Sequence, residues 1–372
     1  MSTSRSSAHR CREGESAMRR ATRAVRVGTL MIGGDAPVTV QSMTKTDTRD
    51  IDATVRQIDE LTDAGCEIIR LAVPDMEAAT ALGEIKRRTR LPLVADIHFD
   101  YRLALEALRQ GVDKLRLNPG NIGGRERVAA VATAAKERGV PIRIGVNAGS
   151  LQSDLRGLPL PEAMVESALR HAAMLEDVDF PDILLSVKAA EVMETIAAYR
   201  LLAQRCSYPL HLGVTHTGSE ASGLIRSGLG IGSLLVDGIG DTLRVTLTAD
   251  PVAEVRAGYE ILRATERRRV GPEIIACPTC GRTEIDLRGL LATVEAALAD
   301  VRTPIRVAVM GCAVNGPGEA RDADIGVAGG RGGGVIFRHG RILRRVEEEQ
   351  MADSFLAELR LLLRERGQTE NP

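Results

Sequence analysis

Three cysteines in the last quarter of the sequence have the residue type and the spacing of metal ligands. Cys277 and Cys280 form a Cys-x-x-Cys pair, in which a tight turn can direct both sulfur atoms to one point. Cys312 follows Gly311 on a separate glycine-rich turn and can reach the same point from another side. Three soft ligands leave one coordination position for a weaker or exchangeable ligand, which is typical of a working centre rather than of a closed structural one.

The residues by themselves leave the kind of metal centre open. His339 would complete a structural Cys3His zinc site. An iron–sulfur cluster on three cysteines fits the spacing better, because clusters accept a different fourth ligand. Glu319 lies seven residues after Cys312, behind an Asn-Gly-Pro-Gly turn that can bring its carboxylate back to the same centre. Spacing alone does not distinguish Glu319 from a carboxylate on a surface loop.

A second set of chemically capable residues recurs at one parity along short apolar segments nearer the N-terminus. Side chains alternate along a strand, so residues of one parity point to one side of a sheet and, in a closed barrel, into its interior. The set consists of Arg70, Asp96, His98, Arg116, Asn118, Arg143, Asn147, Ser186, Lys188, Arg244 and Thr246. Five members are basic, and Asp96 is the main acidic one, so the sequence predicts a strongly cationic barrel mouth.

This excess of positive charge predicts an anionic ligand. Isolated buried cations are costly unless they are paired, and arginine binds phosphoryl oxygens through two parallel hydrogen bonds. A diphosphate is the simplest ligand that fits. Any single arginine could instead point outward between the helices, because parity can slip at a bulge. His98 could act in acid–base chemistry or as a structural histidine.

The elements that must position these residues alternate regularly from Val38 to about Glu266. Strand-like segments are expected at 38–43, 67–73, 91–97, 114–118, 141–147, 183–189, 209–215 and 242–248. Each is followed by an amphipathic helical segment. The first helix is expected to begin with Asp52 as its N-cap. Eight alternations predict a closed parallel (β/α)8 TIM-type barrel of the α/β class, because an open doubly wound sheet usually has fewer strands.

The chain is long enough for two domains behind a short tail. We expect a disordered tail at 1–21, although its Arg and Ser content also suits a transit peptide. The barrel should span 22–266, a charged Pro/Gly stretch at 267–271 should form a linker, and 272–372 should form a small α+β domain. The elements expected in that domain are strands at 273–277 and 304–310, short strands near Ile325 and Val335, a hairpin or loop at 329–334, and helices at 286–301 and 347–366.

Composition excludes several classes of partner. The formal net charge of -1 provides no overall field toward nucleic acid or a membrane surface. The absence of Trp, with only 4 Phe and 4 Tyr, argues against stacking platforms for single-stranded nucleic acid. No apolar run approaches the roughly 18 residues of a membrane span. Cys11, Cys66 and Cys206 stand singly, which is not a secreted disulfide framework and predicts a cytoplasmic location.

Several longer motifs resemble those of one known family. They are the stretches at 40–44, 95–100, 117–123, 142–150, 238–242 and 315–319, which read VQSMT, ADIHFD, LNPGNIG, IRIGVNAGS, GIGDT and NGPGE. They are similar to the 4-hydroxy-3-methylbut-2-enyl diphosphate synthases of the methylerythritol phosphate route to isoprenoids. The resemblance runs from about Thr22 to the last helix and corresponds to the compact two-domain type.

The resemblance implies an iron–sulfur oxidoreductase. A 4Fe-4S cluster on Cys277, Cys280 and Cys312, with Glu319 as a displaceable fourth ligand, would deliver two electrons from reduced flavodoxin or ferredoxin. The substrate would be 2-C-methyl-D-erythritol 2,4-cyclodiphosphate, whose ring opens with loss of water. Family members are homodimers in which the cluster domain of one subunit caps the barrel of the other. Diphosphate binding would fall on Arg70, Arg116, Arg143, Asn147, Lys188 and Arg244. Asn118 and Thr246 are further candidates for substrate binding.

Two positions depart from the family pattern. Where the family usually has Thr-Glu-Ala-Gly, this chain has Thr215-His216-Thr217-Gly218, so His216 replaces an acidic residue near the reacting carbons. His216 could take over its acid–base task, the task could be less essential than supposed, or this chain could be impaired or altered in substrate. Thr246 stands where Ser is commoner and keeps the hydroxyl. His98, His216 and Glu319 are therefore the catalytic candidates.

Two other functions compete with this one. The chain could be a redox-neutral barrel enzyme on another phosphorylated substrate, with a structural zinc domain. It could also be a non-catalytic cluster sensor, although a sensor would not explain a polyanion pocket, and a basic stripe for nucleic acid is absent.

Overall fold

The computed structural model describes residues 19–215, 218–299, 301–312 and 320–367. The chain divides between Arg268 and Arg269 into two compact units. Each unit has a sheet and a hydrophobic core of its own. None of the helices in the described ranges combines the length and the apolar character that crossing a bilayer requires.

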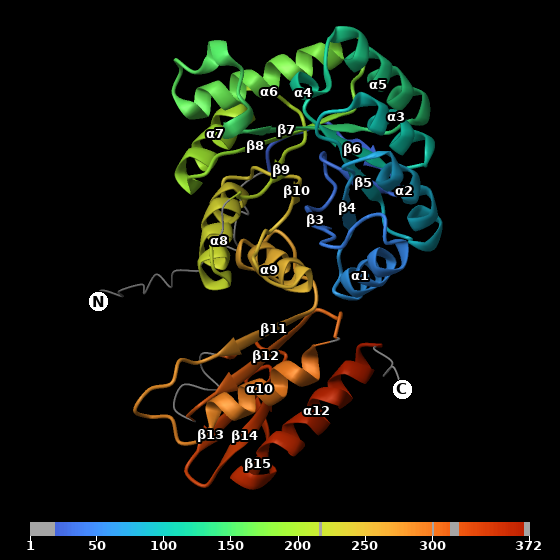
Figure 1. Ribbon diagram of the computed structural model, residues 1–372. Helices are drawn as coiled ribbons and strands as arrows, with labels where there is room; N and C mark the ends of the chain where they lie inside the picture. The colour runs from blue at the N-terminus through green and yellow to red at the C-terminus, as the bar shows by residue number, and fades with distance from the viewer. Residues whose placement is uncertain (1–18, 216–217, 300, 313–319, 368–372) are drawn as a thin grey trace, which may run out of the picture. The chain divides into compact units, whose positions relative to one another are not determined.

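The first unit is the predicted parallel barrel (Figure 1). Its strands are β3 Thr39–Met43, β4 Ile68–Ala72, β5 Leu93–Asp96, β6 Lys114–Leu117, β7 Ile142–Asn147, β8 Ile183–Lys188, β9 His211–Leu212 and β10 Thr242–Leu243. Their order is β8-β7-β6-β5-β4-β3-β10-β9, and a parallel bridge between Leu185 and Leu210 joins the two ends. The sheet therefore closes on itself, and the TIM-type barrel predicted from eight alternations is confirmed.

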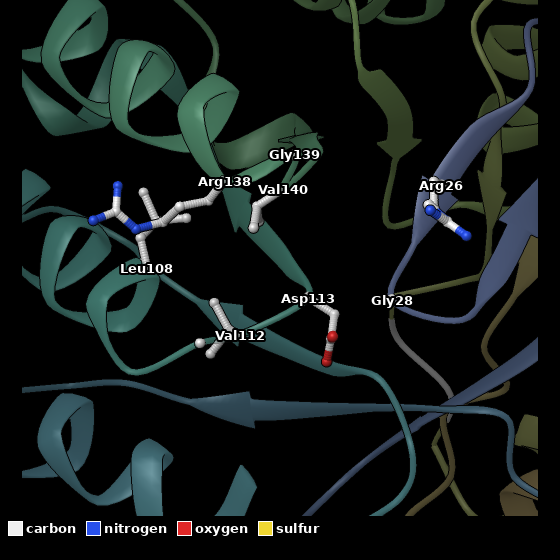
Figure 2. Close-up of a pocket in the computed structure, with 9 residues that line it drawn as sticks. Arg26, Gly28, Leu108, Val112, Asp113, Arg138, Gly139 and Val140 are labelled. Atoms are coloured by element: carbon white, nitrogen blue, oxygen red, sulfur yellow. The ribbon is translucent and has the colours of Figure 1, made fainter.

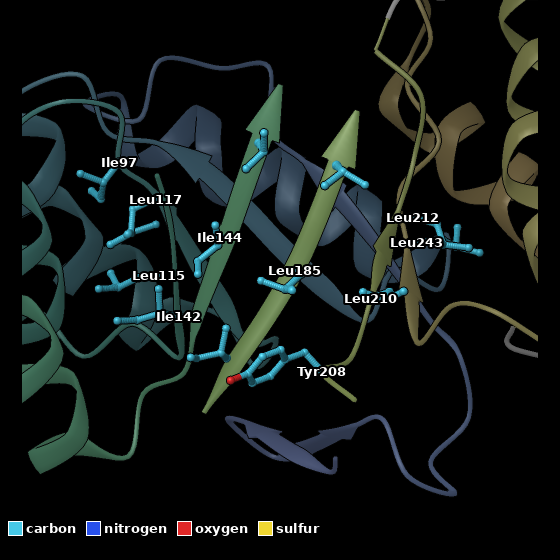
Figure 3. Packing of buried hydrophobic residues seen from close by; sticks show 14 of the residues in the cluster. Ile97, Leu115, Leu117, Ile142, Ile144, Leu185, Tyr208, Leu210, Leu212 and Leu243 are labelled. Atoms are coloured by element: carbon cyan, nitrogen blue, oxygen red, sulfur yellow. The ribbon is translucent and has the colours of Figure 1, made fainter. Parts of the chain in front are cut away.

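A ring of helices surrounds these strands (Figure 1). The helices are α1 Ile51–Asp63, α2 Met76–Arg88, α3 Tyr101–Arg109, α4 Pro119–Ile122, α5 Arg125–Arg138, α6 Leu160–Glu176, α7 Val192–Arg205, α8 Glu220–Val236 and α9 Pro251–Ala264, with 3-10 turns η1 Ala148–Ser150 and η2 Ser153–Leu155. Outward strand residues such as Leu115, Ile144 and Leu185 pack in the same core as apolar residues of the helices (Figure 3). Alternate residues of each strand therefore pack outward against the helices, and the residues between them face the barrel interior.

The N-terminal end of the barrel is closed by a hairpin that the sequence did not predict. Strands β1 Val25–Val27 and β2 Leu30–Ile32 pair antiparallel. Their apolar side chains cluster with the inward residues Ile68, Val94 and Leu184. Strands of three residues are too short to show an alternating pattern. The barrel therefore has an apolar floor, and polar residues occupy the levels above it.

Some element boundaries differ from the predictions. The N-cap of α1 is Asp50, not Asp52, because the Asp50 carboxylate accepts a 3.0 Å hydrogen bond from Ala53 N. The expected strands at 209–215 and 242–248 are reduced to β9 and β10. Arg19, which lies in the expected tail, forms a 2.8 Å ion pair with Asp241, so the chain already contacts the barrel there.

The second unit is a five-stranded α+β domain. Its strands, in sheet order, are β11 Pro272–Ala276, β12 Ile305–Met310, β13 Ile325–Gly330, β14 Gly333–Arg338 and β15 Arg341–Glu347. The helices α10 Leu287–Leu298 and α12 Met351–Glu365, the latter preceded by the turn η3 Glu348–Gln350, share a core with apolar residues of the sheet. The residues at 329–334 form the expected hairpin between β13 and β14. Strand β15 was not predicted, since charged residues interrupt its apolar pattern.

Candidate active site

The strand register brings the predicted basic and polar residues to one end of the barrel interior. Parallel pairing sets Arg70 beside Met43, Asp96 beside Arg116, and Asn147 beside Lys188. Paired residues in a parallel ladder face the same side of the sheet. All lie at or near the C-terminal ends of their strands, which is the end where active sites of TIM-type barrels form. We call this level the barrel mouth.

Asp96 is the acidic centre of the mouth. Its carboxylate lies 3.1 Å from Arg116 Nη1, 3.8 Å from Arg70 Nε and 3.4 Å from His98 Nε2. Burial raises the pKa of Asp96, but the hydrogen bond with His98 and the charges of Arg70 and Arg116 outweigh burial and hold that pKa well below its usual value. Asp96 therefore stays ionised and fixes the side chains of both arginines.

A second carboxylate enters the mouth from a helix and was missed from the sequence. Glu254 on α9 is 2 % exposed and lies 3.3 Å from Arg244 Nη2. It also lies 3.5 Å from Lys45 Nζ and accepts a hydrogen bond from Leu247 N at 3.0 Å. Strand parity cannot reveal a residue that reaches in from a helix. Arg244 is thus held by Glu254 just beyond the end of β10.

The positive charges and N–H donors of the other basic residues in the mouth are only partly matched by acidic groups and hydrogen-bond acceptors. Arg143 is buried and donates to Ser186 Oγ at 2.8 Å, while its Nε and Nη2 atoms have no hydrogen-bond partner among the described residues. Burial, reinforced by neighbouring positive charges, lowers the pKa of Lys188 well below its usual value. Burial also lowers the pKa of Arg70 to about 10, against the attraction of Asp96. The mouth therefore keeps positive charge and free N–H donors for an anion.

Two glycines make room for these cations. A Cβ atom on Gly145 would lie 2.7 Å from Arg116 Nε, and one on Gly213 would lie 2.7 Å from Lys188 Nζ. The absence of side chains at these two positions lets the basic groups lie across the neighbouring strands. Glycine at these two positions therefore allows Arg116 and Lys188 to occupy their places in the mouth.

A pocket of about 390 Å³ opens at this level. It is lined by Ile97, His98, Phe99, Arg116, Asn118, Asn121, Gly145, Asn147 and Gly149. The Asn118 side chain caps α4 through its Oδ1 atom and leaves Nδ2 without a hydrogen-bond partner among the described residues. His98 and the two predicted asparagines therefore share one cavity with Arg116. Thr246 lies partly buried beyond the end of β10.

A larger depression, of about 550 Å³, contains none of the predicted site residues. Its lining includes Arg26 of the hairpin, and Asp113 and Arg138 before β6 and β7, at the N-terminal ends of the strands (Figure 2). Asp113 is already bound there by Lys86 and by Leu93 N. Cavity size therefore does not indicate the candidate site, whereas the convergence of charged groups does.

The cysteines lie on turns after two neighbouring strands of the second unit. Cys277 follows β11, and its Sγ accepts a hydrogen bond from Gly311 N at 3.1 Å, which ties it to the turn that carries Cys312. Cys280 is exposed, and hydrogen bonds with Arg282 lower the pKa of its thiol. Within the described ranges, no three or more His, Cys, Asp or Glu side chains come close enough together to hold a metal ion.

Comparison with known proteins matches both units to one family. The GcpE TIM-barrel domain matches residues 22–259, and the GcpE protein C-terminal domain matches residues 273–361. The chain belongs to the GcpE family. This membership confirms the resemblance drawn from the sequence motifs.

Proteins similar to this GcpE-family chain are named as enzymes. A protein of Geobacter sulfurreducens named 4-hydroxy-3-methylbut-2-en-1-yl diphosphate synthase (flavodoxin) is 58% identical over 352 residues, which cover 94% of this chain and 100% of that protein. A protein of Thermodesulfovibrio yellowstonii with the same name is 57% identical over 345 residues, covering 92% and 99%. The zinc-domain and sensor alternatives find no support among these names.

A solved structure outside the family shares the barrel fold. Dihydropteroate synthase from Stenotrophomonas maltophilia superposes with a TM-score of 0.52 at 16% identity, covering 66% of this chain and 98% of that one. At this identity the likeness concerns the fold alone.

Two predicted residues of this GcpE-family chain, His216 and Glu319, lie outside the described residues. Two others were overlooked: Lys114 and His211 are fully buried in the barrel interior, below the mouth. Parity could have found them, because Lys114 lies two residues before Arg116 on β6, and His211 lies two residues before Gly213.

Proposed function

We propose that this GcpE-family chain is a 4-hydroxy-3-methylbut-2-en-1-yl diphosphate synthase. It would convert 2-C-methyl-D-erythritol 2,4-cyclodiphosphate, two electrons and two protons into 4-hydroxy-3-methylbut-2-enyl diphosphate and water. The observation that carries the proposal is 58% identity with a relative of that name along its whole length. The cationic mouth independently supports a diphosphate as the substrate class.

In this proposal the barrel mouth binds and orients the diphosphate. Arg116, Arg143 and Arg244 offer N–H donors that suit phosphoryl oxygens. Arg70 and Lys188 add positive charge, and the Nδ2 atom of Asn118 supplies a neutral donor. Asn147 would contact the substrate from the end of β7, and Thr246 would do so from the segment after β10. Because Asp96 and Glu254 already fix three of the arginines, little reorganisation is needed when the substrate arrives.

The donor set on the turns fits an iron–sulfur cluster. Cys277, Cys280 and Cys312 carry free thiols, and the hydrogen bond from Gly311 N to Cys277 Sγ is of the kind that tunes cluster sulfurs. We propose that these cysteines hold a 4Fe-4S cluster, with Glu319 as the exchangeable fourth ligand. When bound, the cluster supplies the two electrons that ring opening requires. The chain's own task there is to hold the three thiolates and to exclude competing ligands.

We propose that His98 and His216 handle protons at the substrate. His98 lies in the pocket at the mouth, next to Asp96, and His216 takes the place of the family's acidic residue. Replacement of His216 by Gln should lower kcat by about a hundredfold or more, in keeping with the loss of a general acid or base. His216→Glu should leave turnover unchanged or lower. A large gain in turnover with His216→Glu would contradict this role.

The proposed reaction requires a protein that donates electrons. The relatives' names indicate flavodoxin as the electron donor, and ferredoxin is the other carrier of the expected kind. We propose a cytoplasmic homodimer. To test whether the cysteine turns serve the barrel of the second subunit, an Arg143→Met chain and a Cys312→Ala chain, each with little or no activity alone, are refolded together. Recovered activity supports assembly across two chains, whereas none supports assembly within one.

The activity itself is tested with anaerobically purified protein. Iron and acid-labile sulfide should be present, and the cyclodiphosphate should be turned over with reduced flavodoxin. Electron paramagnetic resonance of the reduced protein should shift when the cyclodiphosphate is added. Zinc without sulfide would contradict the proposal, and so would a full cluster that shows neither turnover nor a shifted signal.

A further inference from the structure

A second polar level lies below the mouth and above the apolar floor of the barrel. We call it the lower tier; it consists of Thr39, Gln41, Lys114, His211 and Thr242, and it shares Arg143 with the mouth, because register sets Arg143 beside Arg116. Each of these six residues is exposed by 2 % or less. Register places Thr242 beside both Thr39 and His211, so these three face the same side. Lys114 Nζ donates to Gln41 Oε1 at 3.3 Å. The lower tier is therefore a closed polar layer directly beneath the cations of the mouth.

Many polar atoms of the lower tier lack partners among the described residues. They are Thr39 Oγ1, Gln41 Nε2, Arg143 Nε and Nη2, both ring nitrogens of His211, and Thr242 Oγ1. Buried polar atoms without hydrogen bonds are unfavourable, so natural interiors fill such spaces with ordered water. Water in the lower tier would also give its side chains a route for proton exchange.

Lys114 has no acidic partner in this tier among the described residues; its one hydrogen bond is to Gln41. The charged or titratable groups that face it from other strands are Arg143 on β7, Arg70 on β4 and His211 on β9, and Arg116 follows on its own strand. Asp96 on β5 lies one level higher and is already bound by Arg116 and Arg70. Burial and the charges of Arg143 and Arg70 lower the pKa of Lys114 well below its usual value.

A diphosphate in the mouth would raise the pKa of Lys114 again, because its negative charge opposes the effect of the neighbouring cations. Negative charge that enters a buried interior of low dielectric constant favours the protonated form of any nearby amine. Ring opening strengthens the effect, because a cyclic diphosphate has one ionisable oxygen on each phosphorus whereas an open diphosphate ester has three in all. The barrel interior therefore becomes more negative as substrate turns into product, and an additional cation beneath the mouth would offset part of that charge.

We propose that Lys114 is a positioning residue of the diphosphate site: it is neutral in the empty barrel and takes up a proton from solvent when a diphosphate occupies the mouth. The proton comes through water of the lower tier, and Lys114 acts through Arg143 rather than by touching the ligand. In the empty barrel the neutral amine spares the mouth a further repulsion. In the occupied barrel its charge strengthens binding of the anion. This inference rests on the proposed function, because it assumes a diphosphate in the mouth.

The test measures proton uptake during binding of inorganic diphosphate. Isothermal titration calorimetry in buffers of different ionisation enthalpy gives the number of protons taken up by the wild type, by Lys114→Met and by Lys136→Met. The wild type should take up about one proton more than Lys114→Met and bind the anion about tenfold more tightly near neutral pH. Lys136 is an exposed lysine of α5 paired with Asp179, so Lys136→Met should behave as the wild type.

A second variant at position 114 separates loss of proton uptake from loss of folding. Lys114→Arg carries a permanent charge, so it should bind diphosphate without the extra proton. If Lys114→Met does not fold, Lys114→Arg still decides the question. Proton uptake by a folded Lys114→Met or Lys114→Arg protein that equals the wild-type uptake would overturn the inference while leaving normal turnover, and thus the proposed function, intact. Conversely, a chain that fails to turn over the cyclodiphosphate but still shows Lys114-dependent uptake would contradict only the synthase activity.

Discussion

The barrel mouth and the cysteine turns are built in opposite ways. In the mouth, Asp96, Arg116 and Arg143 lie on strands whose parallel ladders fix their direction, and all three are buried. Cys280, by contrast, is exposed, and Cys277 and Cys312 lie on turns after strands. The fold alone organises the mouth, whereas the cysteine site is of the kind in which the ligated group completes the geometry. The two halves of the chemistry should therefore respond differently to mutation.

The largest effect should follow from removing a thiol. We expect Cys312→Ala to lose iron, sulfide and turnover together, because a cluster has no substitute for a missing thiolate at this position. Binding of inorganic diphosphate to the same protein should remain within about twofold of the wild type, because the mouth is organised without the cluster. Metal analysis and calorimetry on one preparation check both. Cys206→Ala, at a lone cysteine after α7, is the matched control and should keep its cluster.

A loss of diphosphate binding in Cys312→Ala would break the comparison, since it would mean that the mouth depends on the cysteine site. An intact cluster in Cys312→Ala would show instead that this cysteine is not a ligand.

The second-largest effect should follow from removing a basic residue of the barrel mouth. We expect Arg143→Met to keep its full iron and sulfide content but to lose about a hundredfold or more in kcat/KM, because a buried cation with free donors is removed from beneath the anion. Arg138→Met, on the exposed end of α5, is the matched control. Equal losses of cluster and of activity in Arg143→Met would indicate that the two regions do not behave independently.

The same difference explains how far the sequence could predict the molecule. Regular alternation predicted the eight-stranded barrel, and strand parity predicted which face Arg70, Arg116 and Arg143 would share. Both rules depend on local periodicity, which a sequence displays directly. The spacing of Cys277 and Cys280 indicated a ligand pair, but spacing carries no information on how turns fold around an absent group.

What the sequence could not reveal comes from contacts between distant elements. Glu254 reaches Arg244 from a helix, and no periodicity marks it. The β1–β2 hairpin is too short to show a pattern. Asp50 and Asp52 are both plausible N-caps, and only the hydrogen bond to Ala53 N selects Asp50. These features depend on tertiary packing rather than on local preference.

The third effect concerns the carboxylate that organises the mouth. We expect Asp96→Asn to lower kcat/KM by about tenfold and the free energy of unfolding by about 3 kcal/mol, because two buried arginines lose their counter-charge. The pKa of Asp96 is lower in the folded than in the unfolded chain. Its stabilisation is therefore complete above the unfolded value of about 3.9 and is lost as pH falls through the folded value.

Urea unfolding of the wild type and of Asp96→Asn, measured from about pH 8 down to pH 3, tests this sign. The difference in unfolding free energy should stay constant down to about pH 5 and shrink below about pH 4. A difference that grows on acidification would refute the ionised, paired state of Asp96.

The smallest effect should come from a single methyl group in the mouth. A Cβ on Gly145 would lie 2.7 Å from Arg116 Nε, so Gly145→Ala must displace that guanidinium, which is the flexible end of a long side chain. We expect KM to rise about fivefold with kcat nearly unchanged, because binding geometry is disturbed while the cysteine site is untouched. Gly157→Ala, where no atom lies within 4 Å of the added carbon, is the matched control. A fall in kcat with unchanged KM would mean that Arg116 acts on the reaction itself rather than on binding, so the mouth would contribute to the chemistry as well as to substrate binding.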